Sequence, residues 1–389
     1  MRRLVHIATV PDSLVFLRGQ AAYMRSRGIE TTVITSPGPA LDAFAASEGV
    51  EAFAVPMQRA ITPRADAVAL ARLVRLLRRI RPDLVHSHTP KGGLLGTTAA
   101  FLARVPSRIY HMRGLRFAAS PAGPQRQLLT AAERTSCTLA TQVLCVSHSL
   151  RDVALSERLC APAKIRAIGS GSGQGVDATG RFNPDAQPRE LRAQVRAEHG
   201  VPENARVLGF VGRIVRDKGV AELVAAWRRL RLAHPNLHLL VVGPFEPEDP
   251  IDPADRALLE ADERVHLVGF RRDTERFYAA MDLVALPTYR EGFPNVPLEA
   301  AAMRLPVVAT KIPGCVDAVA DGRTGTLVPA RDASALHDAI ERYLDDLSLA
   351  RAHAEAGRAR VLAEFRREAI WEGIAGVYAA EVGRTRTSG

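Results

Sequence analysis

Two glutamates eight residues apart flank a short proline-containing stretch in "YREGFPNVPLEAAAMRLPVV", residues 289–308. The apolar run "LVALP" precedes this stretch, and its alanine-rich end is typical of a helix. Pro297 suits the first turn of that helix, because proline lacks the N–H that would be unpaired there. We therefore predict that Glu291 lies on a loop after a strand and that Glu299 lies in the first helical turn. An ionised carboxylate can accept hydrogen bonds from both hydroxyls of a vicinal diol.

A basic turn stands upstream of the glutamates, in "FVGRIVRDKG". A predicted strand over residues 207–211 runs into Gly212 and Arg213, and Lys218 stands at the start of the next predicted helix. Arginine can bind phosphate through its planar fork and lysine as a point charge, so the pair could close on a diphosphate. Either feature alone is more often a solvated surface charge. Together, two diol-binding carboxylates and a diphosphate-binding turn suit a nucleotide sugar.

The elements that must position these residues alternate between short apolar strands and longer amphipathic helices. The predicted strands cover residues 4–8, 32–35, 84–88, 108–110 and 143–146 in the first half, and 207–211, 239–242, 265–268, 283–286, 307–309 and 325–328 in the second. The main predicted helices cover residues 16–27, 65–80, 93–103, 220–233, 333–344 and 364–380. This alternation indicates parallel sheets with helices on both faces. Such sheets bind ligands beyond the carboxyl ends of their strands.

The chain of 389 residues is long enough for two domains. A polar, proline-bearing segment, "DATGRFNPDAQPRE", separates the two alternating series and indicates a connection between them. We therefore expect a first domain over residues 1–178, an inter-domain linker over 179–205, a second domain over 206–364, and a C-terminal helix and tail over 365–389. The expected fold class is α/β, with two doubly wound Rossmann-like domains.

The net charge of +10 is spread unevenly. Residues 1–178 hold 23 lysines and arginines against 11 acidic residues, a net of +12, and the remainder holds 29 against 31, a net of −2. This excess favours a polyanion, an anionic membrane surface or a diphosphate-bearing partner near the first half. The four cysteines show no metal-binding spacing, which fits a reducing cytoplasm. No apolar run is long enough to span a bilayer, and the N-terminus does not read as a signal peptide.

Three segments, "GVDATGRFNP", "GRIVRDKG" and "LPTYREGFPNVPLEAAA", together resemble the retaining GT-B glycosyltransferases of family four, also called group 1 glycosyltransferases. The resemblance covers nearly the whole chain and is strongest over residues 207–329. It implies that the two Rossmann-like domains face an inter-domain cleft and that the C-terminal helix packs back on the first domain. It also implies that the first domain binds the acceptor and the second domain binds the nucleotide-sugar donor.

The resemblance assigns roles to the residues of the second half. Glu291 would hold hydroxyls of the donor sugar, Glu299 the ribose diol, and the basic pair the diphosphate. The segment "HLVGF" resembles the strand end whose backbone lines the base. The expected donor-binding residues are Gly212, Arg213, Lys218, Val268, Gly269, Phe270, Glu291, Gly292, Phe293, Pro294, Asn295, Val296 and Glu299.

Two segments of the first half, "VHSHTPKGGLLG" and "RIYHMRGLRF", resemble a subgroup that acts on lipid-linked or polysaccharide acceptors. His86 and His88 alternate at a strand end and share one face. They could bind a metal, but no third ligand stands at a suitable spacing. Lys91 and Gly92 begin a helix where an acceptor phosphate could bind, and a plain glycine-containing helix start explains them equally well. The expected acceptor-binding residues are His88, Lys91, Gly92 and Arg116.

The chain departs from the family pattern at three places. Many relatives have a glycine pair after the first strand, whereas this chain has "TVPDSLVFLRGQ". Many relatives carry a histidine at the position of Arg113, whereas this chain has His111 two residues earlier, so either side chain could contact the donor. Arg304 replaces the usual glycine, and nothing in the sequence explains it. The expected catalytic residues are Arg213, Lys218, Glu291, His111 and Arg113.

The sequence therefore predicts a retaining, metal-independent hexosyl- or N-acetylhexosaminyltransferase of cell-surface polysaccharide biosynthesis, such as capsule or lipopolysaccharide. The expected donor is a UDP-sugar, and the expected acceptor is a polyprenyl diphosphate-linked or growing polysaccharide. No cofactor or metal and no nucleic acid are expected, and the expected location is the cytoplasm, at the inner face of the membrane. The alternatives are a GT-B epimerase or phosphorylase and a non-catalytic nucleotide-sugar-binding protein. A nicotinamide dehydrogenase is excluded because the first turn, "IATVPDSLV", contains no glycine.

Overall fold

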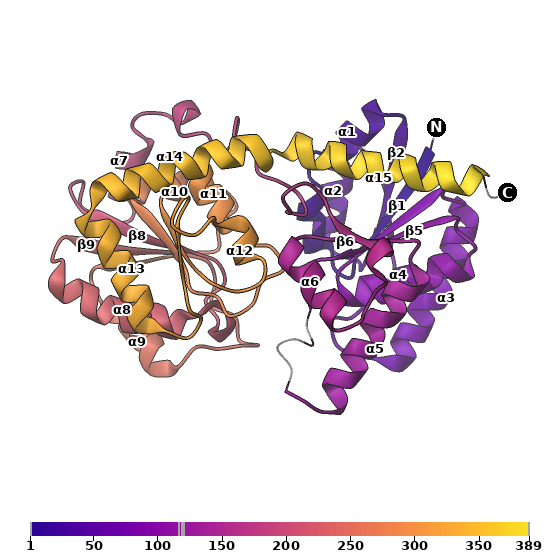
Figure 1. The fold of residues 1–389 in the computed structure, drawn as a ribbon, viewed down its shortest axis with the longest axis horizontal. Coiled ribbons are helices and arrows are strands. Elements are labelled where there is room, and N and C mark those ends of the chain that lie inside the picture. Colours follow the sequence, from indigo (N-terminus) through magenta and orange to yellow (C-terminus); the bar gives the residue numbers. More distant parts are fainter. Residues whose placement is uncertain (1, 116, 118–120, 388–389) are drawn as a thin grey trace. The chain divides into compact units, whose positions relative to one another are not determined.

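The computed structural model describes residues 2–115, 117 and 121–387. The chain forms two compact units (Figure 1). Unit 1 comprises Met1–Gln174 together with Glu368–Gly389, and unit 2 comprises Gly175–Arg367. The segment 179–205, where the sequence indicated a connection, lies within unit 2, because Phe182, Leu191 and Val195 are buried in its core.

Unit 1 is built on a parallel sheet that has seven strands in the described part of the chain, in the order β3-β2-β1-β4-β5-β6-β7. These strands are β1 (Arg2–Ile7), β2 (Ile29–Thr35), β3 (Glu51–Ala54), β4 (Leu84–His88), β5 (Ser107–Met112), β6 (Gln142–Cys145) and β7 (Ile165–Ala167). The helices are α1 (Gln20–Ser26), α2 (Pro39–Glu48), α3 (Pro63–Ile80), α4 (Pro90–Leu102), α5 (Pro124–Leu139), α6 (His148–Ser156) and α15 (Arg367–Thr387), with 3-10 turns η1 (Pro11–Leu17) and η3 (Pro162–Lys164).

Side-chain alternation along the strands divides the interior of unit 1 into two layers. Val5 of β1 and Val85 of β4 pack with α3 and α4 on one face. Leu4 and Leu84 pack with α1 and α15 on the other face. Because successive residues of a strand point to opposite faces, the histidines of β1 and β4 that follow these leucines by two residues lie on the α15 side.

Helix α15 completes unit 1, although it is the last helix of the chain (Figure 1). Ile370, Ile374 and Tyr378 recur every four residues and are buried against the sheet. Trp371 packs on Gly19, where a Cβ would lie 2.8 Å from its ring. Gly19 has φ +77°, so this position suits glycine both for its backbone and for the close approach. The expected packing of the C-terminal helix on the first domain is confirmed.

Unit 2 is built on a second parallel sheet, with six strands among the described residues, in the order β10-β9-β8-β11-β12-β13. They are β8 (Arg206–Val211), β9 (Leu237–Val242), β10 (Val265–Gly269), β11 (Leu283–Leu286), β12 (Val307–Thr310) and β13 (Thr326–Val328). The helices are α7 (Leu191–Glu198), α8 (Val220–Ala233), α9 (Pro253–Ala261), α10 (Thr274–Ala280), α11 (Val296–Ala302), α12 (Cys315–Ala318), α13 (Ala333–Asp345) and α14 (Leu347–Glu364), with 3-10 turns η4 (Pro184–Ala186) and η5 (Arg216–Lys218).

The two faces of the second sheet are covered by different helices. Helices α8, α9 and α13 bury one face with residues such as Trp227 and Ile340. Helices α7, α10, α11 and α14 bury the other with residues such as Phe277 and Leu298. Two doubly wound parallel sheets are therefore confirmed. The edge strands β3 and β7 of the first sheet were not predicted from the sequence.

No helix of the described residues is both long enough and apolar enough to cross a membrane.

We expect Ile374→Ala to destabilise the protein by about 2–5 kcal/mol, because it opens a cavity where α15 meets the sheet. Ile374 is only 1% exposed. Glu372→Ala in the same helix is the matched control, since Glu372 is 70% exposed and its pairing with Arg27 spans 3.6 Å at the surface. Urea unfolding followed by tryptophan fluorescence measures both variants. Equal midpoints for the two would mean that α15 does not stabilise unit 1.

Candidate active site

The loops that follow β8 and β11 meet at the carboxyl edge of the unit 2 sheet. The two strands are parallel neighbours, so their carboxyl ends lie side by side. Gly219 begins α8 at φ +68°, and a Cβ there would lie 1.9 Å from the carbonyl oxygen of Pro287. Glycine is therefore required for this approach. Two hydrogen bonds to the Asp217 carbonyl oxygen add to it, one from the backbone N–H of Tyr289 at 2.9 Å and one from the side-chain hydroxyl of Thr288 at 3.2 Å.

Lys218 and Glu291 form a salt bridge between these two loops. Both side chains are only 16% exposed, so the pair is largely shielded from water. The ammonium group carries three protons, and its hydrogen bond to the carboxylate uses one. Lys218 can therefore hold Glu291 and a phosphate oxygen at the same time.

Arg213 follows β8 directly and is half exposed. Its Nη1 donates to Glu246 at 2.7 Å. The segments that follow β8 and β9 approach each other closely here, because a Cβ on Gly243 after β9 would lie 1.8 Å from the carbonyl oxygen of Gly212. The structure thus places both cations of the predicted diphosphate-binding turn at one edge of the sheet, each paired with a different carboxylate.

Glu299 lies in the first turn of α11, as predicted. The phenol of Tyr278 on α10 donates to its Oε2 at 3.0 Å. Burial raises the pKa of Glu299, and the Tyr278 hydrogen bond and the positive charges of Arg181 and Arg367 oppose that rise. Sequence reasoning missed Tyr278, because it reaches Glu299 from a helix 21 residues away along the chain.

The remaining predicted donor-binding residues lie on two segments of unit 2, one at the end of β10 and one after β11. Phe270 follows β10 and is 64% exposed, after Gly269 at φ +75°. The segment between β11 and α11 comes close to the start of α12, since a Cβ on Gly314 would lie 2.5 Å from the carbonyl oxygen of Gly292. Val268 and Gly269 end β10 and Phe270 follows it, whereas the segment after β11 carries Glu291, Gly292, Phe293, Pro294 and Asn295, and Val296 begins α11.

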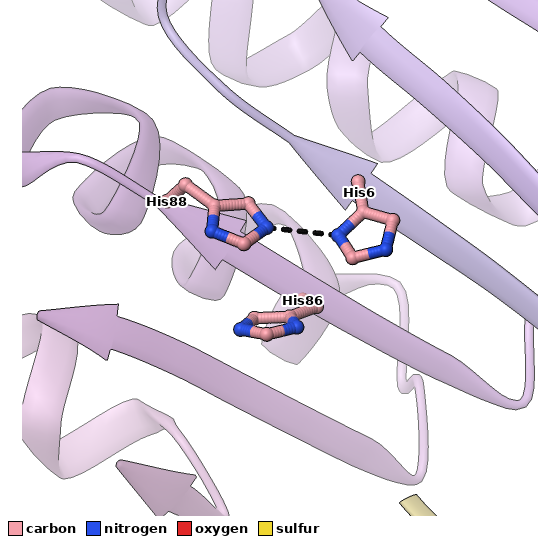
Figure 2. Close-up of side chains that lie close together, drawn as sticks. All are labelled: His6, His86 and His88. Atoms are coloured by element: carbon pink, nitrogen blue, oxygen red, sulfur yellow. Dashed lines mark hydrogen bonds between the residues drawn. The ribbon is translucent and has the colours of Figure 1, made fainter. Parts of the chain in front are cut away.

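In unit 1, four buried histidines gather on the α15 face of the sheet. Figure 2 shows three of them, His6 of β1 with His86 and His88 of β4. His111 of β5 stacks on His86 with ring centroids 5.2 Å apart. The phenol of Tyr378 on α15 lies 2.6 Å from His86 Nδ1. No third ligand stands near His86 and His88 in the sequence, but the structure supplies His6, whose nitrogen lies within 4.8 Å of theirs.

A hydrogen-bonded chain from Arg113 fixes the tautomers of His88 and His6. Arg113 Nε donates to His88 Nδ1 at 3.4 Å, so the proton of neutral His88 is on Nε2. His88 Nε2 then donates to His6 Nδ1 at 2.8 Å (Figure 2). A metal ion bound to His88 Nε2 would require the His88 proton to be on Nδ1, where it would face the N–H of Arg113. The positive charge of Arg113 would also repel the ion. These histidines therefore do not suit a cation.

Arg113 lies beyond the end of β5 and is the cation of this cluster. Its guanidinium covers the ring of Phe16 at 4.3 Å. A Cβ on Gly173 would lie 2.4 Å from its Nη1. Among the residues that the structure describes, no carboxylate forms a salt bridge with Arg113. Burial lowers its pKa to about 9, so it remains charged at neutral pH.

Lys91 and Gly92, predicted to bind the acceptor, already have partners at the start of α4. Lys91 Nζ bonds Asp66 at 2.7 Å, Thr62 at 3.4 Å and the carbonyl oxygen of Ala60, which are as many acceptors as the ammonium has protons. Gly92 N donates to Thr9 Oγ1 at 2.9 Å. An acceptor phosphate would have to displace one of these contacts. Arg116 lies outside the described residues.

Arg304, unexplained by the sequence, has a structural role in unit 2. It follows α11 at φ +56°, in the region that glycine adopts most easily. Its guanidinium forms a two-pronged pair with Asp185, at 2.6 and 2.8 Å. The pair joins the end of α11 to η4.

Two family models match the chain. One, described as glycosyl transferases group 1, matches residues 205–346, and the other, described as glycosyl transferase 4-like domain, matches residues 14–171.

Known proteins are similar to most of the chain. The capsular polysaccharide biosynthesis glycosyltransferase CapM of Staphylococcus aureus is 33% identical over 97% of this chain and 97% of its own length. The UDP-Gal:alpha-D-GlcNAc-diphosphoundecaprenol alpha-1,3-galactosyltransferase of Escherichia coli is 27% identical over 79% of this chain and 78% of its own. The solved structure of Anabaena Alr3699/HepE in complex with UDP-glucose has a TM-score of 0.81 at 21% identity, covering 98% of this chain and 100% of that one.

We expect the stability of unit 1 to depend on pH, because burial lowers the pKa of His6 to about 3 and holds those of His86, His88 and His111 well below their usual range. The unfolded histidines titrate near pH 6.5, so below that pH the unfolded chain binds more protons than the folded chain. The free energy of unfolding therefore falls as the pH drops from about 6.5 toward 3, by up to about 1.4 kcal/mol per pH unit for each histidine.

Urea unfolding between pH 7.5 and 5 measures this dependence. The control is His111→Phe, which keeps a stacking ring and removes one titrating group, so its stability should fall less steeply. A stability that does not change over this range would contradict the prediction.

Proposed function

The chain belongs to the group 1 glycosyltransferases, and we propose that it transfers a sugar, with retention of its anomeric configuration, from a nucleotide-sugar donor to a lipid-linked or growing polysaccharide acceptor. The observation that carries this proposal is the meeting of Lys218, Glu291 and Arg213 at the carboxyl edge of one parallel sheet. We assign donor binding to the second domain, residues 206–364, and acceptor binding to the first, residues 1–178.

The proposed donor is a UDP-sugar. Arg213 and Lys218 would bind its diphosphate, Glu291 hydroxyls of its sugar and Glu299 the ribose diol. The segment ending in the exposed Phe270 would line the base. The name of the E. coli relative includes a UDP-sugar, and the Anabaena protein was solved with UDP-glucose, which supports this choice.

The proposed reaction breaks the bond between the sugar C1 and the diphosphate oxygen, and forms a bond from C1 to an acceptor hydroxyl on the same face. Negative charge grows on the departing diphosphate, which takes the proton of the attacking hydroxyl. Arg213 and Lys218 would stabilise that charge without a metal ion. No side-chain base is required in this scheme.

As the residue of unit 1 that contacts the substrate, we favour Arg113 over His111. His111 is 2% exposed within the histidine cluster, whereas Arg113 stands beyond the strand end and remains charged. A charged guanidinium without a carboxylate partner among the described residues suits an anionic group of donor or acceptor. His88 would orient it, and Lys91 and Gly92 would keep the start of α4 in place.

The proposed acceptor is a polyprenyl diphosphate-linked sugar or a growing polysaccharide of capsule or lipopolysaccharide type. Support comes from the names of two relatives, one a capsular polysaccharide glycosyltransferase and one that names a diphosphoundecaprenol acceptor. An acceptor of this kind would place the enzyme in the cytoplasm at the inner face of the membrane, with an anionic lipid surface as a further partner.

We expect Lys218→Ala to lower turnover roughly 100- to 1,000-fold, because one contact to the charge that develops on the diphosphate is lost. The matched control is Arg216→Ala in the same turn, since Arg216 is 70% exposed and pairs with Asp249 outside the proposed contact set. Initial rates with donor and acceptor, together with a urea midpoint that shows folding, measure the effect. Near-normal turnover of Lys218→Ala would refute its role.

We expect UDP-sugars to raise the melting temperature more than GDP- or ADP-sugars, because a ligand that binds only the folded state stabilises it by mass action.

Sugar transfer or slow donor hydrolysis would distinguish the transferase from a non-catalytic binder. A free, isomerised sugar nucleotide would indicate the epimerase alternative, and phosphate-dependent release of sugar phosphate would indicate the phosphorylase.

A further inference from the structure

Helix α3 presents a basic stripe on its outer side. Its buried residues are Ala69, Leu73 and Leu77, which recur every four residues. The opposite side carries exposed residues at intervals of three or four, namely Arg64, Val68, Arg72, Arg75 and Arg79. Successive members of such a series lie on one face of a helix, so the arginines form one continuous charged row.

The charge of this region is not balanced within unit 1. Residues 64–108 contain nine lysines and arginines and two acidic residues, a net of +7. Both acids are already engaged, since Asp66 pairs with Lys91 at 2.7 Å and Asp83 accepts from Arg3 N at 2.7 Å. In the described part of the chain, no salt bridge joins a carboxylate to any arginine of this stretch. Seven of the eight arginines of this stretch, all except the half-buried Arg108, are exposed to solvent.

A groove with apolar side chains continues the stripe where α3 and α4 end. Its volume is about 760 Å³, and its lining includes Arg78, Arg104 and Arg108 but no acidic residue. Phe101 is 50% exposed and Leu102 is 45% exposed. Arg78 Nη2 donates to the carbonyl oxygen of Leu102 at 3.2 Å and so ties the end of α3 to this groove. Arg108 covers the ring of Phe101 at 5.7 Å.

We propose that the α3–α4 surface, meaning the arginine stripe and this groove, binds an anionic phospholipid bilayer. Arginines near an anionic membrane each contribute about 1 kcal/mol of attraction. Phe101, Leu102 and Val68 would enter the boundary between headgroups and acyl chains, as the apolar side chains of interfacial helices do. Leu102 and Val68 offer a nucleic acid no stacking surface, and Arg108 already covers the ring of Phe101. A lipid surface therefore fits this region better than a polynucleotide.

This inference rests on the proposed function only for its purpose, which is to hold the enzyme beside a lipid-linked acceptor. Binding itself requires neither donor nor turnover.

The test is sedimentation of the full chain with vesicles of phosphatidylcholine alone or mixed with phosphatidylglycerol. We expect binding to the mixed vesicles that weakens with salt, and little binding to phosphatidylcholine. The variant R72Q/R75Q/R79Q should bind the mixed vesicles roughly 100-fold more weakly, through the loss of three charges. The matched control R228Q/R229Q/R342Q removes three exposed arginines from unit 2 and should bind as the unchanged protein does.

A second variant, F101S/L102S, separates insertion from charge. It should lose the part of the binding that persists at high salt, and both side chains are exposed, so the fold should tolerate the change. Equal binding by the α3 triple variant and its unit 2 control would overturn the proposal. So would tight, salt-dependent binding of single-stranded RNA without vesicle binding. If the protein bound vesicles but neither bound nor turned over a nucleotide sugar, the result would support the membrane-binding surface and contradict the proposed function.

Discussion

The salt bridge between Lys218 and Glu291 is the interaction on which the proposed donor site depends. It joins the loops after two neighbouring strands, and both partners are largely shielded from water. A charge in such a place needs its partner, because removing either one leaves the other poorly solvated. The contact of Gly219 with the Pro287 carbonyl brings the two loops close enough for the pair to form. The proposed donor-binding groups are thus held in position by the same contacts that shape the sheet edge.

Much of the fold could be predicted from the sequence, because buried parallel strands are short apolar runs and the helices between them are amphipathic. Glu299 and Lys218 were placed on the correct elements, since a proline and a glycine mark the helix starts beside them. The edge strand β3 escaped prediction because its sequence, "EAFA", has no run of buried residues. Strand β7 has only three residues.

The partners of the predicted site residues could not be predicted, because each comes from a distant part of the chain. Tyr278 reaches Glu299 from α10, and Asp66 reaches Lys91 from α3. His6 was missed for the same reason, although it lies two residues after Leu4, on the same face of the strand that pairs with β4. The tautomer of His88 depends on Arg113, which stands on yet another strand end. Spacing along the sequence reveals which element carries a residue, whereas the order of strands decides what that residue meets.

Helix α15 has a consequence for how the chain is made. Its apolar residues cover Leu4, Ile109 and Leu144 of the unit 1 sheet, yet it is synthesised after the whole of unit 2. During synthesis, unit 2 can assemble its core while the first sheet still has one face exposed to water. The first sheet therefore reaches its native form only after α15 has been made, so a chain interrupted within α15 would lose the fold of the segment that was made first.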